Sequence, residues 1–292
     1  MNRRGFTLSE LLVGLSVMAI LGVALTRILI NDSRFVSRQD AMLGARQGAR
    51  AALSTIVAEL SVVADTPIVA TRDSLEVRVP VAFGLTCRAV GSGIRIVSIL
   101  PVDSVAWASF DTTGLMWRRQ TGGYRRLNPG WISTTTLASD SAQCKADSVR
   151  MIAGGKLIRV GGLDGTSCDV TLTDPNCQPD SLAVAMLYSR VKYLFAPSSD
   201  LPGRIGLWRR NQKGVVDELV TPFDTGASFA YLMGGPNAAT MTLRTTDVTS
   251  TASRDSIRGV ELRLYAASEN KTQGASSYQV FPLKTRIRFS NR

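Results

Sequence analysis

The first 26 residues constrain this chain more than any other stretch. They begin Met1-Asn-Arg-Arg-Gly-Phe-Thr-Leu-Ser-Glu10, and uncharged residues then continue from Leu11 to Thr26. An ionisable group at membrane depth costs about 2.5–3.5 kcal/mol on insertion scales. Glu10, at the edge of this apolar run, therefore requires a partner that offsets the cost. The identity of that partner decides what the protein does.

Three interpretations fit residues 1–30. A secretory signal peptide would be cut near Gly22-Val23-Ala24, but the apolar character continues beyond that site. A plain signal anchor needs only the 21 residues from Phe6 to Thr26, which span about 31 Å as a helix. On this interpretation Glu10 can be explained only as a helix-capping residue, and Thr7-Leu-Ser-Glu10 does fit the S/T-x-x-E capping box.

The third interpretation accounts for every feature of the stretch. Gly5-Phe6-Thr7-Leu8-Ser9-Glu10-Leu11-Leu12-Val13 resembles the cleavage and methylation signature of type IV prepilins and pseudopilins. The resemblance implies that a membrane aspartyl peptidase, the prepilin peptidase, cuts after Gly5 and N-methylates Phe6. It also implies that Glu10 pairs with the terminal amine of a neighbouring subunit. Lipid tolerates such a pair better than either ion alone.

The helical pattern continues past the apolar run. The apolar residues that follow are spaced by seven, seven, four, three and four, which is a single helical stripe: Phe35, Met42, Ala49, Leu53, Ile56 and Leu60. Pro67 ends the pattern, since proline lacks an amide donor and disfavours helix at the residue before it. We therefore predict one helix over residues 6–64, with its first half in the membrane and its second half packed on a head.

The period changes from 3.6 to 2 after Pro67, which predicts strands. Pro80 within the first strand indicates an edge position or a bulge. Gly122-Gly123 and Gly154-Gly155 each predict a hairpin. The expected strands are 75–83, 94–100, 115–119, 124–127, 151–152, 156–160, 184–195, 205–209, 215–220, 228–233, 241–245, 259–267 and 283–290.

This order predicts an α+β, pilin-like fold: one long N-terminal helix packed on a mostly antiparallel β-sheet head. The expected divisions are a leader at 1–5, the helix at 6–64, a β-rich region at 65–183 and a C-terminal antiparallel sheet at 184–292. The region 65–183 is longer than a minimal pilin head requires and has room for an inserted β subdomain. The segments around Tyr193, Leu207, Asp217 and Phe229 resemble the heads of PilW-type minor pilins and J-type pseudopilins.

Cysteine usage indicates disulfides rather than metal binding. Four cysteines follow an apparent export segment, which favours disulfides outside the cytoplasm. Cys168 and Cys177 bracket the turn sequence Asp174-Pro-Asn, so we predict that they are bonded, and Cys87–Cys144 then follows by elimination. The paired C-x₂₋₄-C spacing of a Cys₄ zinc site is absent.

Other chemistry finds little support in the sequence. The chain has no His, which excludes His-based metal sites and Ser-His-Asp or Cys-His catalysis. We predict no enzyme, cofactor or metal. A solvated acidic loop is the preferred interpretation of the carboxylates near the second cysteine pair, and Ca²⁺ binding is the alternative. These carboxylates are Asp164, Asp169, Asp174 and Asp180.

The formal net charge of +11 is compatible with a polyanionic partner or with a merely soluble surface. Arginine doublets lie near aromatic residues, an arrangement that also occurs in single-strand nucleic-acid grooves. We favour the interpretation that they are exposed strand ends, which leaves a nucleic-acid partner possible but unsupported. The doublets begin at Arg118, Arg125 and Arg209, and the aromatic residues are Trp117, Tyr124, Trp131 and Trp208.

The sequence therefore predicts a structural minor pilin or pseudopilin in the inner membrane, with its head on the periplasmic side. It is expected to assemble into a type IV pilus or a type II secretion pseudopilus, and its large head favours a priming or capping subunit over the repetitive shaft. Its expected partners are other pilins through the N-terminal helix, the prepilin peptidase and the inner-membrane assembly platform. The alternative from a different class is an envelope domain on an uncleaved anchor that binds a ligand or hydrolyses a substrate.

Overall fold

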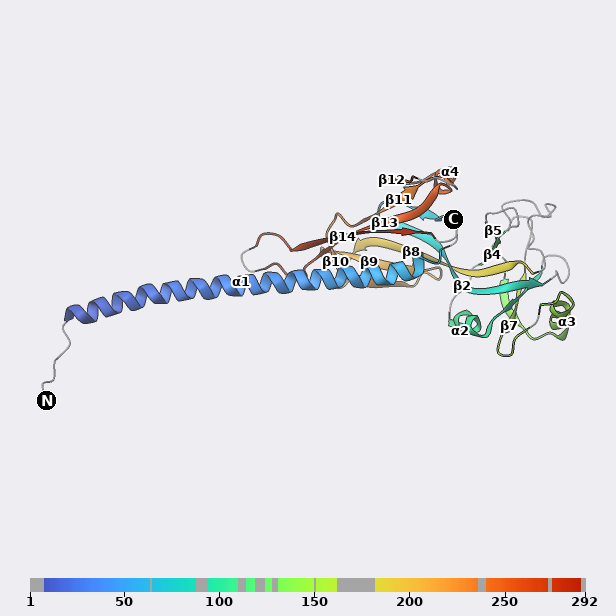
Figure 1. The fold of residues 1–292 in the computed structure, drawn as a ribbon, viewed down its shortest axis with the longest axis horizontal. Coiled ribbons are helices and arrows are strands. Elements are labelled where there is room, and N and C mark those ends of the chain that lie inside the picture. Colours follow the sequence, from blue (N-terminus) through green and yellow to red (C-terminus); the bar gives the residue numbers. More distant parts are fainter. Residues whose placement is uncertain are drawn as a thin grey trace.

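A long helix and a β-rich head make up the computed structural model of this chain (Figure 1). The structure describes residues 8–63, 65–87, 94–109, 114–118, 124–127, 131–149, 151–161, 182–235, 240–272 and 275–289. The helix projects from one end of the head, so its first described turns lie far from every strand (Figure 1).

The long helix is α1, Leu8–Leu60, with 53 residues and a length of about 80 Å at 1.5 Å per residue. It ends four residues before the expected position 64. The amide of Val63 donates to the carbonyl of Leu60, a tighter i→i−3 bond that closes the last turn. The prediction of a single continuous helix is otherwise confirmed over the described residues.

The strands all pair antiparallel in one sheet. They are β1 Val69–Ala70, β2 Ser74–Cys87, β3 Arg95–Ile99, β4 Gly114–Arg118, β5 Tyr124–Leu127, β6 Trp131–Thr135, β7 Lys156–Gly161, β8 Val184–Pro197, β9 Ile205–Asn211, β10 Val216–Phe223, β11 Ser228–Met233, β12 Thr242–Arg244, β13 Ile257–Ala267 and β14 Val280–Arg288. Among the residues that the structure describes, three short helices accompany them: α2 Pro101–Ser109, α3 Ala138–Ala146 and α4 Thr251–Arg254. The expected α+β architecture is confirmed.

The long strands β2 and β8 pair from Ser74↔Leu194 to Leu85↔Val184 and run through two lobes (Figure 1). The proximal lobe contains the C-terminal half of α1, β1, the first half of β2, the second half of β8 and β9–β14. The distal lobe contains the second half of β2, β3–β7, α2, α3 and the first half of β8. The register shifts between Pro80 and Ala82, so the expected bulge at Pro80 lies where one lobe gives way to the other.

Each lobe has its own hydrophobic core. The proximal core holds Leu75, Val77 and Val79 of β2 together with α1 and the C-terminal strands. The distal core holds Ala82 of β2 with side chains of β3, β4, β7 and β8. Residues 65–79 therefore share a core with the C-terminal strands. The described residues from the second half of β2 to the first half of β8 build the distal lobe.

Of the two hairpins expected at Gly-Gly pairs, the structure contains one. The hairpin at Gly122-Gly123 is confirmed, since β4 and β5 pair antiparallel. The hairpin at Gly154-Gly155 is wrong: Met151 and Ile152 are exposed and not in a strand, and β7 pairs with β3 and β6 instead. Gly154 adopts a left-handed φ of 86°, and a Cβ there would meet Pro101 at 3.4 Å, so this turn packs on α2.

Candidate functional site: an exposed apolar helix and the head that carries it

The first half of α1 presents apolar side chains without cover. Every described residue from Leu8 to Val36 is exposed, and Met18 and Ile20 are 77% and 70% exposed. By length and composition this segment can cross a membrane, with a mean hydropathy of 2.2 over an 18-residue window. Burying such a surface in lipid or against other helices is strongly favourable.

The hydroxyl groups within the apolar segment are satisfied by the helix itself. Ser16 donates from Oγ to the carbonyl of Leu12 at 2.7 Å, and Thr26 donates from Oγ1 to the carbonyl of Gly22 at 2.8 Å. Internal satisfaction of this kind is what a hydrocarbon environment demands of polar groups. The described part of the segment thus carries one ionisable side chain before Arg27, which is Glu10.

Glu10 lies in the first turn of α1 and is exposed. A carboxylate in this position is favoured by the positive end of the helix dipole. Gly5 and Phe6, the expected cleavage and methylation residues, lie outside the described residues. Their roles stay predictions.

The second half of α1 packs on the proximal lobe through small and aliphatic side chains. Ala45, Ala49, Ala52, Ile56 and Leu60 are buried against β2, β10, β13 and β14. Small residues let the helix lie close to the sheet, and a Cβ at Gly48 would stand 3.6 Å from Val220.

The expected stripe is therefore correct toward its C-terminal end and wrong at its start. Phe35 is 60% exposed, and Met42 is half-buried. Periodicity identifies the face of a helix but not how far along it the head extends. The head begins to cover α1 at Ser37, the first residue of the helix that is not exposed.

A polar cluster fixes the end of α1 to the sheet. Glu59 accepts a hydrogen bond from the hydroxyl of the fully buried Tyr193, and its Oε1 lies 2.9 Å from a guanidinium nitrogen of Arg209. Burial, together with the negative charge of Glu59, raises the pKa of Tyr193, so the phenol stays protonated as the donor. This cluster ties the helix to β8 and β9.

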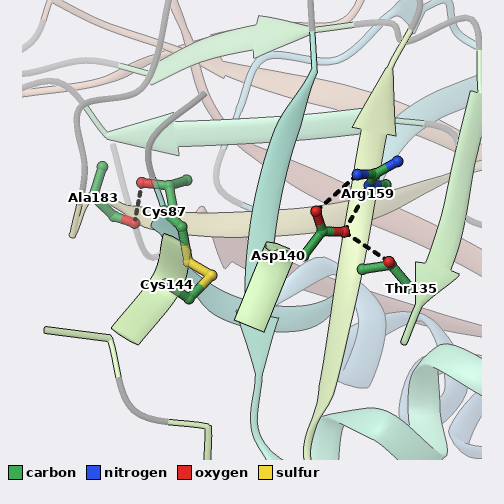
Figure 2. The surroundings of a disulfide bond; sticks show 7 residues. Cys87, Thr135, Asp140, Cys144, Arg159 and Ala183 are labelled. Carbon is green, nitrogen blue, oxygen red and sulfur yellow. Dashed lines mark hydrogen bonds and ion pairs between the residues drawn. A yellow bond between two sulfur atoms is a disulfide. The ribbon is translucent and has the colours of Figure 1, made fainter. Parts of the chain in front are cut away.

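In the distal lobe, a disulfide joins Cys87 of β2 to Cys144 of α3, with the two Cα atoms 5.0 Å apart (Figure 2). Both cysteines are buried. It is the pairing expected by elimination, although its counterpart, Cys168–Cys177, lies outside the described residues. The bond closes a loop with a sequence separation of 57, for which the chain-entropy model gives about 4 kcal/mol of stabilisation.

A buried ion pair lies beside the disulfide. Asp140 of α3 is fully buried, and Arg159 of β7 donates to its two oxygens from Nε at 2.6 Å and from a terminal nitrogen at 2.7 Å (Figure 2). Thr135 Oγ1 donates a third hydrogen bond at 2.7 Å. The disulfide and this pair hold α3 on the sheet at two points.

One arginine from each of two doublets is ion-paired in the fold, so the expectation that the doublets are exposed strand ends is wrong for Arg126 and Arg209. Arg126 lies 3.0 Å from the buried carboxylate of Asp65, and Arg209 is bound to Glu59. Trp117 is 3% exposed and lies in the distal core, so it offers no stacking surface. These contacts support a structural role for the arginines.

No group of three or more His, Cys, Asp or Glu that could hold a metal occurs among the described residues. The four aspartates considered for Ca²⁺, Asp164, Asp169, Asp174 and Asp180, lie outside them. The functional surface that the structure does describe is the exposed half of α1.

Comparison with known proteins bears on the same segment. Residues 1–26 match the family model of the prokaryotic N-terminal methylation motif. Comparison with curated proteins and with solved structures gave no match. The match covers the leader and most of the exposed apolar half of α1, and the head lies outside it.

Proposed function

We propose that this chain, which carries the N-terminal methylation motif of the type IV prepilin and pseudopilin family, is a structural subunit of a type IV pilus or a type II secretion pseudopilus. The observation that carries the proposal is the continuity of the motif with α1, whose apolar side chains are exposed from Leu8 to Ile30. A helix with this surface is suited first to the membrane and then to packing among other apolar helices.

The chain is inserted in the inner membrane with Arg3 and Arg4 on the cytoplasmic side, as the positive-inside rule favours. Its head is then extracytoplasmic, where the Cys87–Cys144 disulfide can form. The prepilin peptidase removes Met1–Gly5 and methylates Phe6. Other pilins and the inner-membrane assembly platform then take up the processed helix.

The shape of the head favours a place at the filament tip, as a PilW-type minor pilin or a J-type pseudopilin. The distal lobe lies beyond the C-terminal end of α1, at the opposite end of the described structure from the start of that helix (Figure 1). In a filament of parallel helices, successive subunits are displaced along the axis. The distal lobe would then project into the space of the next head, which suits a priming or capping subunit.

The terminus of the mature chain tests the proposal directly. Intact-mass analysis of the membrane-extracted protein is expected to give a chain that begins at N-methyl-Phe6. The same protein from cells that lack the prepilin peptidase should retain Met1–Gly5. Retention of Met1–Gly5 in cells with an active peptidase contradicts the proposal and favours the uncleaved anchor.

The tip position has its own test. An epitope inserted in the β9–β10 turn, at Gln212-Lys213-Gly214, lies on the exposed surface of the head. Immunogold electron microscopy of purified filaments is expected to place this epitope at one end only. An equivalent epitope on the major subunit serves as the control and should label the whole shaft. Labelling of this chain along the shaft contradicts a tip role but leaves its membership of the filament intact.

A further inference from the structure

Five described strands have a single partner strand, and four of them are poor templates for pairing. Strands β1 and β12 have two and three residues. Strand β14 carries Pro282 and the exposed Lys284, Arg286 and Arg288, and β5 carries two arginines. Short length, proline and charge are the devices by which proteins prevent unwanted strand addition.

Strand β6 is the fifth, and it has none of these devices. It pairs with β7 alone among the described strands, from Trp131↔Gly161 to Thr135↔Leu157. Its sequence, Trp131-Ile-Ser-Thr-Thr135, has no charge and no proline, and Ser133 and Thr134 are exposed. Within the described part of the chain, no strand pairs with the outer edge of β6, and its backbone donors and acceptors are groups to which an extended chain can bond.

A buried donor points to the chemistry of the partner. Arg125 of β5 is the cross-strand neighbour of Trp117, so its side chain lies on the same face as the distal core. Its Nε is buried and has no hydrogen-bond partner among the described residues. A buried donor without an acceptor is costly, and a carboxylate is the acceptor that satisfies a guanidinium best.

Strands β5 and β6 lie at opposite ends of the distal part of the sheet, whose strand order is β5-β4-β8-β2-β3-β7-β6. The chain from Leu127 to Trp131 spans at most about 14 Å. One inserted strand needs about 10 Å between its neighbours, which is two strand spacings. The length of the link is therefore compatible with a strand that pairs with β6 and brings a side chain toward Arg125.

We propose that the edge of β6 is an acceptor site for an extended segment of another protein, which adds as a strand and places an acidic side chain at Arg125. A second copy of this chain is a poorer occupant, because two chains of net charge +11 repel each other. The inference does not depend on the proposed function, since strand addition requires only that the distal lobe is folded.

Fluorescence anisotropy with the full chain in detergent tests the site. The probe is a labelled nine-residue peptide of alternating valine and threonine with a central glutamate. A matched peptide carries a central lysine. Two further peptides carry N-methyl groups, which remove backbone N–H donors, on one or the other set of alternate amides, so that each blocks one of the two ways in which the peptide can pair with β6. The glutamate peptide is expected to bind saturably. The lysine peptide and at least one N-methylated peptide should bind about tenfold more weakly.

Protein variants assign the contact to Arg125. Arg125→Gln should remove the preference for glutamate over lysine, whereas Arg125→Lys should retain it. Arg286→Gln, which removes a cation from the β14 edge, should change nothing. The proposal is overturned by an absence of saturable binding, by binding that survives both N-methylated registers, or by a preference that persists in Arg125→Gln. Sedimentation that shows a dimer dispersed by the peptide would assign the edge to a second copy instead.

Discussion

The variant Glu10→Ala is expected to be cleaved after Gly5 as the natural chain is, but to be incorporated into filaments about 100-fold less, since a charge left alone at membrane depth costs about 2.5–3.5 kcal/mol. Cleavage creates an amine at Phe6, four residues before Glu10. Without the carboxylate of a neighbouring subunit, that amine enters the apolar helix bundle uncompensated. The measurement is the ratio of processed protein in the sheared filament fraction to that in the membrane fraction.

Glu10→Gln distinguishes an ion-pair role of Glu10 from a helix-capping role. Glutamine serves in a capping box as well as glutamate does, so a capping role predicts normal assembly of this variant. An ion pair predicts that Glu10→Gln fails as Glu10→Ala does, because glutamine carries no charge. Ser9→Ala, in the same turn, is the control and should assemble normally. Normal incorporation of both Glu10 variants would refute the pairing argument.

The sequence predicts those parts of the fold that local signals encode. Strand β11 occupies the predicted residues 228–233, because its apolar run is bounded by turn residues on both sides. Strands β9, β10 and β13 differ from expectation by at most three residues at either end. The Gly-Gly pair between β4 and β5 likewise identifies a hairpin, because the glycines and the two strands that they join are close together in the sequence.

Elements that depend on distant contacts are not predictable in this way. The sequence of α3 mixes helix-forming alanines with Ser and Asp residues that favour caps and turns, and it has no apolar stripe of helical period that would predict a helix. Its helix is held instead by Cys144, which bonds to Cys87, and by Asp140, which bonds to Arg159. These are tertiary contacts that no period in the chain reveals.

The candidate site likewise contains parts that local sequence predicts and parts that depend on distant contacts. The apolar run and Glu10 are adjacent in sequence, so the signature is recognisable from the order of the residues alone. Glu59 is visible in the sequence only as a charged residue off the apolar stripe, and its partner Arg209 lies 150 residues away. The polar cluster that fixes α1 to the sheet and the two-lobed shape of the head both arise from pairings between distant segments, which local patterns do not encode.

Asp140→Ala is expected to lower the free energy of unfolding of the distal lobe by about 3–5 kcal/mol. The substitution leaves the Arg159 guanidinium without its carboxylate in a site where its side chain is only 21% exposed. Urea unfolding of the full chain in detergent, followed by tryptophan fluorescence, measures the loss. Three of the four tryptophans, Trp107, Trp117 and Trp131, lie in the distal lobe and report on it.

The pH dependence of that loss identifies the charge as its cause. Hydrogen bonds from Arg159 lower the pKa of Asp140 below its ordinary value of 3.8. The folded chain therefore binds fewer protons at this site than the unfolded chain, so the stabilisation is complete above about pH 4 and fades as the pH falls through the folded pKa. The difference between the natural chain and Asp140→Ala should shrink in that acid range. Arg286→Ala is the matched control: Arg286 is 62% exposed in its pair with Glu261, and its loss should cost less than about 1 kcal/mol. Equal losses from the two substitutions would show that Asp140 does not hold α3 on the sheet.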